Sequence, residues 1–144
     1  FSDADSLVTA VNADRIRPGH VVVLRGMGPV AMGMPEVLLA TAALANPKLN
    51  GKVALVSDAR VSGVSHGAIG IHCAPEAAVG GPIASVADGD NISIDLLEGT
   101  ITWEGAVDTT HNFSPFNGEE IYLREVSRNS AQAIWGCVSK SVLD

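Results

Sequence analysis

Apolar and polar positions along the chain predict alternating helices and strands in its first half. A first helix is expected to begin after Ser2, whose hydroxyl and a carboxylate three residues later have the spacing of a capping box, and to end near Ala13. Residues 20–25 and 52–57 are apolar on both faces and rich in valine, which indicates buried strands. A helix expected over residues 35–45 separates these strands, so a parallel pair is predicted.

The second half of the chain predicts antiparallel structure after an apolar stretch at residues 68–74. Residues 83–86 and 91–95 are expected to form a hairpin, because the Asp-Gly pair between them favours the positive φ angles of a tight turn. Residues 96–103 extend this hairpin as a meander, and a final helix is expected over residues 118–140. Together these elements indicate an α/β fold whose mixed sheet can curl into a barrel.

The composition narrows the class of protein. Of the 144 residues, 47% are hydrophobic and 17% are charged, which is enough apolar material for one folded domain over residues 1–144. With 9 basic and 16 acidic side chains, the net charge of −7 repels nucleic-acid phosphates and anionic lipid headgroups. No stretch approaches the roughly 20 apolar residues that span a bilayer. Neither a nucleic-acid partner nor a membrane partner is therefore expected.

The cysteines indicate the cellular compartment of the protein, and the first residue indicates that the sequence is part of a longer one. Cys73 and Cys137 form no CxxC pair, and their spacing cannot hold zinc or an iron–sulfur cluster unless other ligands come from elsewhere. Two buried thiols indicate a reducing compartment, which is the cytoplasm or an organelle matrix. The chain opens with Phe1 rather than Met, which suggests that it was cut from a longer protein.

Two segments that follow the predicted strands carry candidate chemistry. Glu36 falls in the first turn of the expected helix at 35–45, where the helix dipole keeps a carboxylate ionised and able to hold a hard cation. A solvated glutamate that merely favours the helix terminus is the simpler interpretation. Residues 57–67 bring hydroxyls, a carboxylate, a guanidinium and an imidazole into one loop. Because loops at the carboxyl ends of parallel strands meet, Glu36 and Ser62 are expected to face one cleft.

Ser62 is a candidate base within this loop. Its neighbour Gly63 has no side chain, so the hydroxyl of Ser62 can approach a substrate closely. A serine hydroxyl is a poor base at neutral pH and needs positive charge nearby to favour the alkoxide. A metal ion held by Glu36 would meet that need.

Two other interpretations of the loop residues are weaker. A hydrolase with Ser62 or Ser65 as nucleophile and His66 as base lacks the GxSxG elbow, and neighbours in sequence seldom reach triad geometry. A metal site made of His66, His72 and Cys73 fails because adjacent residues on a strand point to opposite faces. Buried or capping roles are the simpler expectation for these side chains.

The glycine-rich loop after the first predicted strand has the spacing of a nucleotide-binding loop. Residues 26–31 imitate a GxGxxA dinucleotide-binding fingerprint. In such a site the helix begins at the loop and faces the pyrophosphate, whereas here the next helix is expected only at Pro35. No acidic residue ends the following strand near the usual distance. Dinucleotide binding is therefore not expected.

Three segments resemble the C-terminal domain of the dihydroxy-acid dehydratase and phosphogluconate dehydratase family. They are GMPE at 33–36, DARVSGVSHG at 58–67 and APEAAVGGPIA at 74–84. Their order and spacing match that domain as well. The SHG and PEAAVGG sequences resemble the branched-chain dihydroxy-acid enzymes more than the sugar-acid enzymes, so the resemblance points to branched-chain amino acid biosynthesis.

The resemblance implies a hydro-lyase that converts a 2,3-dihydroxy carboxylate or a sugar acid into a 2-keto acid, using an iron–sulfur cluster and Mg²⁺. Ser62 matches the general base that takes the C2 proton, and Glu36 matches a Mg²⁺ ligand. Gly63, Ser65 and His66 are expected to bind the substrate beside them. The implied fold is a β-barrel flanked by helices, similar to the swivelling β/β/α domain of aconitase.

The resemblance also implies partners outside this chain. In the family the cluster ligands and the other Mg²⁺ ligands belong to an N-terminal domain, which is absent here, so residues 1–144 are expected to be inactive alone. Family members form dimers or tetramers, so a homo-oligomer is expected. The alternative is a non-catalytic barrel that serves as a binding or assembly module on the same scaffold.

Overall fold

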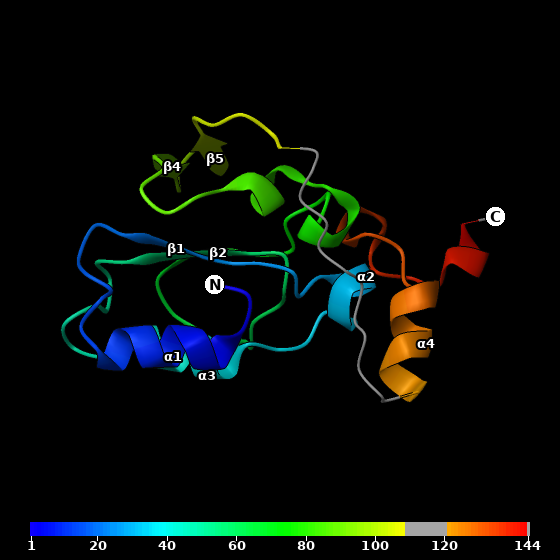
Figure 1. The fold of residues 1–144 in the computed structure, drawn as a ribbon, viewed down its shortest axis with the longest axis horizontal. Helices are drawn as coiled ribbons and strands as arrows, with labels where there is room; N and C mark the ends of the chain where they lie inside the picture. Colours follow the sequence, from blue (N-terminus) through cyan, green and yellow to red (C-terminus); the bar gives the residue numbers. More distant parts are fainter. Residues whose placement is uncertain (109–120, 144) are drawn as a thin grey trace.

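The computed structural model describes residues 1–108 and 121–143 and has an α/β architecture with two separate sheets (Figure 1). The helices are α1 (Ala4–Asn12), α2 (Pro29–Met32), α3 (Leu38–Leu44) and α4 (Ile121–Asn129). The strands are β1 (Val21–Leu24), β2 (Ala54–Ser57), β3 (Ala68–Gly70), β4 (Ile92–Asp95) and β5 (Thr100–Trp103). Short 3-10 helices follow at η1 (Ala77–Val79), η2 (Pro82–Ser85), η3 (Ala133–Trp135) and η4 (Lys140–Val142). Within the described part of the chain, every helix is too short or too polar to cross a membrane.

The main sheet is parallel, with β2 between β1 and β3. The predicted parallel pairing of the two valine-rich strands is confirmed, and Val22 lies opposite Leu55 in its register. Helices α1 and α3 cover one face of this sheet, while α2 and α4 lie beyond the carboxyl ends of the strands (Figure 1). Alternation along β1 buries Val22 and Leu24 under the two covering helices, where they pack with Leu7 of α1.

The predicted barrel is not present among the described residues. The antiparallel strands β4 and β5 form a separate hairpin, so the chain has one three-stranded sheet and one two-stranded sheet. Residues 83–86, which were expected to form a strand, lie instead in and just after η2. One guanidinium nitrogen of Arg25 accounts for this difference, because it donates to the carbonyl oxygens of Ile83, Ala84 and Val86. Carbonyl groups bound in this way favour a tight turn over a strand ladder.

Two helix boundaries differ from the expected ones for local reasons. Asp3 rather than Ser2 caps α1, because Oδ1 of Asp3 accepts a hydrogen bond of 2.6 Å from the backbone N–H of Ser6. Helix α4 ends at Asn129 rather than near residue 140, and the chain then turns so that Ala131 N–H donates to Val138 O. The expected start of this helix at residue 118 lies outside the described residues.

Candidate functional site

The loops that follow β1 and β2 are joined beyond the carboxyl ends of the parallel strands. Glu36 and Arg60 form a parallel bridge, in which Val37 N–H donates to Arg60 O over 3.0 Å. The Nε atom of Arg60 also donates to Met34 O over 2.9 Å. The expectation that Glu36 lies in the first turn of a helix is wrong, because α3 begins only at Leu38 and the preceding backbone pairs with the neighbouring loop.

Glu36 and Ser62 are brought together at this junction. The backbone N–H of Ser62 donates to Oε1 of Glu36 over 2.9 Å. Glu36 is exposed and Ser62 is half-buried, and Oε2 of Glu36 accepts no hydrogen bond from the described residues. The Ser62 hydroxyl oxygen accepts a hydrogen bond of 3.2 Å from Val64 N–H. The site therefore presents a carboxylate oxygen and a serine hydroxyl side by side at the surface.

The other residues predicted to bind substrate differ in their exposure and contacts. Gly63 is exposed, and a Cβ added there would meet nothing within 4 Å, so the approach to Ser62 is open on that side. His66 is exposed as well. Ser65 is tied to the scaffold, because its hydroxyl donates to Thr41 Oγ1 over 3.1 Å and the Thr41 hydroxyl in turn donates to Leu38 O. Ser65 thus joins the loop to α3.

Asp58, which the sequence reasoning did not assign to the site, lies at the base of these two loops. It is fully buried, with 0% of its surface exposed. Its carboxylate accepts three backbone hydrogen bonds, from Gly26 N–H and Ala77 N–H at Oδ2 and from Met27 N–H at Oδ1. A buried carboxylate persists in a core when several donors satisfy it in this way. The sequence pattern that could have indicated this role is an acidic residue placed directly after a strand that is apolar on both faces.

Glu76 is a second buried carboxylate that sequence reasoning left without a role. Its Oε2 accepts hydrogen bonds from Val30 N–H and Gln132 Nε2, and its Oε1 accepts one from Ala31 N–H. Burial raises the pKa of Glu76, the hydrogen bonds from Val30, Ala31 and Gln132 oppose that shift, and the nearby charge of Asp58 adds to it. The backbone N–H of Glu76 also donates to the Gln132 side chain, so the C-terminal segment is attached to the site at this carboxylate.

The Glu76 carboxylate occupies the N-terminus of α2, where a ligand phosphate would have to bind. Helix α2 begins at Pro29, directly after the glycine-rich loop, so the expectation that no helix starts before Pro35 is wrong. Its first free N–H groups nevertheless point at Glu76, and a Cβ at Gly28 would lie 2.6 Å from Cδ of Glu76. The dinucleotide interpretation therefore fails because a carboxylate of the chain itself fills the anion position.

Among the described residues, Glu36 fits the implied Mg²⁺ in part, and no group of ligands for the implied iron–sulfur cluster is present. Glu36 offers one exposed oxygen of the kind that Mg²⁺ prefers, and Mg²⁺ is commonly bound through one or two carboxylates. Cys73 and Cys137 are free thiols, and burial raises the pKa of each. Within residues 1–108 and 121–143, no three His, Cys, Asp or Glu side chains are grouped as metal ligands.

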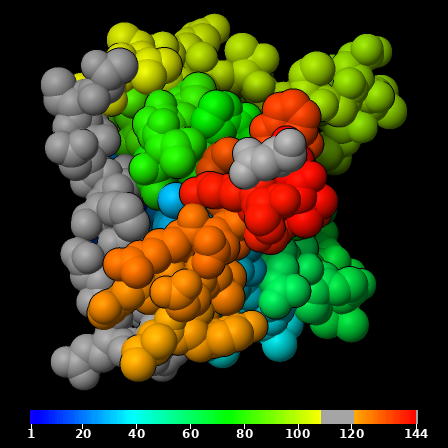
Figure 2. Space-filling view, turned by 90° about the vertical axis from the view of Figure 1, so that its right-hand side faces the viewer, coloured from blue at the N-terminus to red at the C-terminus, as the bar shows by residue number. Residues whose placement is uncertain are grey.

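Helix α4 and the residues after it lie over α2 on the face at the carboxyl ends of the strands (Figure 2). The hydroxyl of Ser127 in α4 donates to Val30 O, and Ala131 is buried just beyond the helix. This cover packs α2 between the sheet and the C-terminal segment, which keeps the N–H groups of α2 aimed at Glu76.

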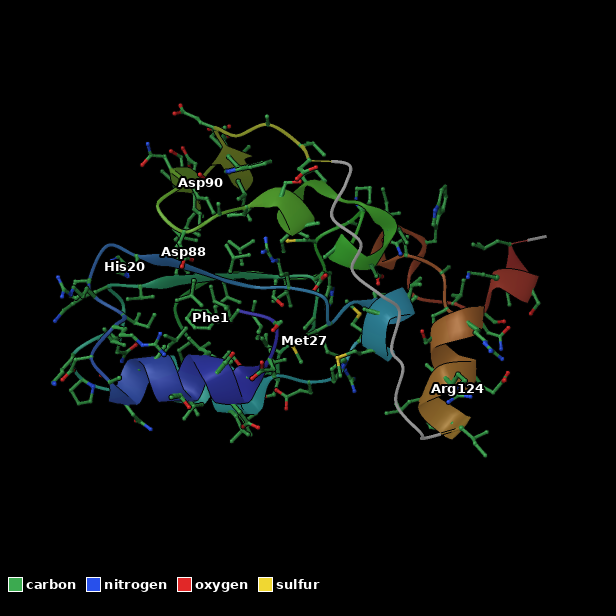
Figure 3. The ribbon with its side chains drawn as sticks, viewed as in Figure 1. Phe1, His20, Met27, Asp88, Asp90 and Arg124 are labelled. Atoms are coloured by element: carbon green, nitrogen blue, oxygen red, sulfur yellow. The ribbon has the colours of Figure 1, made fainter. Side chains whose placement is uncertain are left out.

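A cavity runs along β1 from His20 to Arg25, and neither Glu36 nor Ser62 is among its lining residues. It has a volume of about 860 Å³, and Phe1, His20 and Asp88 are among its lining residues. Figure 3 shows His20 and Asp88 near the start of β1, Phe1 farther along the strand, where its N-terminus donates to Val23 O, and Met27 toward α2. The cavity is therefore separate from the residues with candidate chemistry.

Comparison with known proteins identifies relatives of this chain. The family model described as dihydroxy-acid/6-phosphogluconate dehydratase C-terminal matches residues 1–137. A protein named dihydroxy-acid dehydratase from Pyrobaculum neutrophilum is 55% identical over 94 residues, which is 65% of this chain and 17% of that protein. Its namesake from Pyrobaculum calidifontis is 55% identical over 87 residues, which is 60% of this chain and 15% of that protein. The matched part of the chain thus spans less than a fifth of either relative.

Proposed function

The chain belongs to the dihydroxy-acid/6-phosphogluconate dehydratase family, whose C-terminal domain it matches, and on that premise we propose that it supplies Ser62 and Glu36 to the active site of a hydro-lyase. The proposed substrate is a 2,3-dihydroxy carboxylate, and the product is a 2-keto acid. The observation that carries the proposal is the hydrogen bond of 2.9 Å from Ser62 N–H to Oε1 of Glu36, which holds a candidate base beside a candidate metal ligand.

Ser62 acts on the substrate at C2 in this proposal. Its hydroxyl oxygen, as the alkoxide, takes the proton from C2, and the electron pair of that C–H bond forms the double bond between C2 and C3. The C3 hydroxyl leaves and combines with a proton as water, and the resulting enol tautomerises to the 2-keto acid. The N–H of Val64, 3.2 Å from Oγ of Ser62, stabilises negative charge on the oxygen.

The charge balance at Ser62 explains why a cation is needed. The Glu36 carboxylate lies next to Ser62, and its negative charge disfavours a second negative charge on the serine oxygen. A divalent cation bound at the open Oε2 of Glu36 would supply positive charge that offsets the carboxylate and favours both ionisation of Ser62 and loss of the substrate C2 proton. Glu36 then orients the cation, while Gly63 leaves room for the substrate.

The rest of the proposed active site comes from outside residues 1–144. The described residues include no group of three His, Cys, Asp or Glu side chains placed as metal ligands, so the cluster implied by the family is proposed to be held by an N-terminal domain of the same protein. The matched stretches cover small fractions of both Pyrobaculum relatives, which supports this division. The 144-residue chain alone is therefore expected to be inactive.

The setting of the reaction follows from the same proposal. Gly63 and His66 contact the substrate from the open side of Ser62, while Ser65 holds the loop against α3. The whole protein is proposed to act in branched-chain amino acid biosynthesis, as a homo-oligomer, in the cytoplasm or an organelle matrix. Its proposed partner is a small hydroxy acid.

The experiment that tests the proposal uses the whole protein that contains this chain. Turnover is measured on a panel of branched 2,3-dihydroxy acids and sugar acids, with Ser62→Ala as the variant. We expect kcat on the best substrate to fall by about 10² or more, since a positioned general base contributes on that scale.

Ser93→Ala is the matched control, because it makes the same change in strand β4 of the separate hairpin, where Ser93 is exposed. It should leave kcat unchanged. If Ser62→Ala behaves like Ser93→Ala, the base assignment is wrong, and the chain is better described as a non-catalytic binding or assembly module.

A further inference from the structure

Asp58 joins three segments of the chain at one buried point. Its carboxylate accepts hydrogen bonds of 3.0 Å from Gly26 N–H, 3.0 Å from Met27 N–H and 3.1 Å from Ala77 N–H. These donors come from the loop after β1 and from the start of η1, while Asp58 itself follows β2 directly. No water reaches the carboxylate, since 0% of Asp58 is exposed.

The two loops clamped by Asp58 are the ones that carry Glu36 and Ser62. Gly26 and Met27 begin the segment that continues through α2 to Glu36, and Ser62 lies four residues after Asp58 on the other loop. Farther from the sheet, the bridge between Glu36 and Arg60 and the hydrogen bond from Ser62 to Glu36 join the same two loops again. A substitution at Asp58 is therefore expected to shift one loop relative to the other.

A carboxylate suits this position better than the isosteric amide. A carboxylate accepts hydrogen bonds at both oxygens, whereas asparagine carries an NH₂ group in place of one oxygen. In Asp58→Asn that NH₂ group faces either Met27 N–H or the pair of N–H groups at Gly26 and Ala77. At least one buried donor then loses its acceptor, and the loop that carries it has to move.

We propose that Asp58 is the positioning residue that sets the spacing between Glu36 and Ser62. This inference rests on the proposed function for its catalytic meaning, while its geometric part concerns the folded chain alone. Asp58 contacts no substrate atom in this proposal and acts only through the two loops that it holds together.

The test compares Asp58→Asn with Asp95→Asn in the whole protein. Asp95 also accepts backbone hydrogen bonds, from Leu97 and Glu98, but it is exposed and lies at the end of β4 in the separate hairpin. Hydrogen exchange of the Ser62 amide, which donates to Glu36, is followed by mass spectrometry. We expect this exchange to become about tenfold faster in Asp58→Asn and to stay unchanged in Asp95→Asn.

Hydrogen exchange of the Leu55 amide, in the centre of β2, shows whether Asp58→Asn loosens the whole fold or only moves the loop that carries Ser62. Unchanged exchange at Ser62, or an equal acceleration at Leu55 and Ser62, overturns the inference. Turnover adds a second readout: Asp58→Asn lowers kcat in the parent protein but has no further effect in a Ser62→Ala background, because its effect passes through Ser62.

Failure of this inference can be distinguished from failure of the proposed function. If Ser62→Ala leaves turnover intact, the proposed function fails, and the exchange data still report whether Asp58 holds the loops. If Ser62→Ala lowers kcat by about 10² while Asp58→Asn acts additively with it, the function stands and the positioning role of Asp58 is overturned.

Discussion

The backbone N–H of Ser62 donates to Oε1 of Glu36 over 2.9 Å, although 26 residues separate them in sequence. This bond occupies one carboxylate oxygen and fixes the orientation of the other. The backbone of Ser62 is thereby held against a carboxylate whose Oε2 accepts no hydrogen bond from the described residues. Among the residues with candidate chemistry, this pair couples a potential base directly to a potential cation ligand.

Glu36→Gln separates the charge of this residue from its hydrogen bond. Glutamine retains an oxygen that can accept from Ser62 N–H, but it offers a cation no negative charge. In the whole protein we expect the Mg²⁺ concentration for half-maximal turnover to rise by about tenfold or more. Glu98→Gln, at the exposed turn between β4 and β5, is the matched control. An unchanged Mg²⁺ titration in Glu36→Gln would show that Glu36 holds no cation.

Gly28→Ala tests the packing of the glycine-rich loop against the buried Glu76. The new Cβ would lie 2.6 Å from Cδ of Glu76, and the carboxylate cannot easily move because Val30, Ala31 and Gln132 all donate to it. We expect the free energy of unfolding, measured with urea, to fall by about 1–3 kcal/mol.

The control for this packing prediction is Gly63→Ala, whose Cβ would meet nothing within 4 Å. It should change the free energy of unfolding by no more than about 0.5 kcal/mol. Equal stabilities for the two variants would contradict the close approach of Gly28 to Glu76.

Glu76→Gln should change how stability depends on pH. Burial raises the pKa of Glu76 in the folded chain above its value in the unfolded chain, so the folded state binds the proton more tightly. Protonated Glu76 therefore stabilises the folded state. This contribution is complete below the pKa of Glu76 in the unfolded chain, and it is lost as the pH rises through the pKa of Glu76 in the folded chain. We therefore compare the free energies of unfolding of the parent and of Glu76→Gln. The parent value minus the variant value should fall as the pH rises from the unfolded pKa to the folded pKa of Glu76, and should then stay constant.

Urea unfolding at a series of pH values measures this difference. The pKa values of Asp3 and Asp90 are lowered by hydrogen bonds from Ser6 and Ala87, respectively, and shift stability in the opposite direction. Both residues are common to the two proteins, so their contributions cancel in the subtraction. A difference that rises with pH would show that the Glu76 carboxylate is stabilised in its charged form.

Local sequence patterns were sufficient for the parts of the fold that depend on neighbouring residues. The valine-rich runs predicted β1 and β2 and their parallel pairing, because burial on both faces of a strand leaves a continuous apolar stretch. The meeting of Glu36 and Ser62 also followed from strand order, since loops at the carboxyl ends of parallel strands adjoin. The three motifs were enough to predict the family to which the chain belongs.

Contacts between distant segments decided the rest, and local periodicity does not encode them. Arg25 binds carbonyl groups about 60 residues away and favours a turn over a strand at residues 83–86, and the described strands form two separate sheets rather than the predicted barrel. Asp58 and Glu76 have the charge of surface residues, yet backbone donors from distant loops allow both to be buried. The sequence by itself determined the two valine-rich strands and the family motifs, because both depend on neighbouring residues, whereas only the tertiary structure decided which buried carboxylates join the loops that follow those strands.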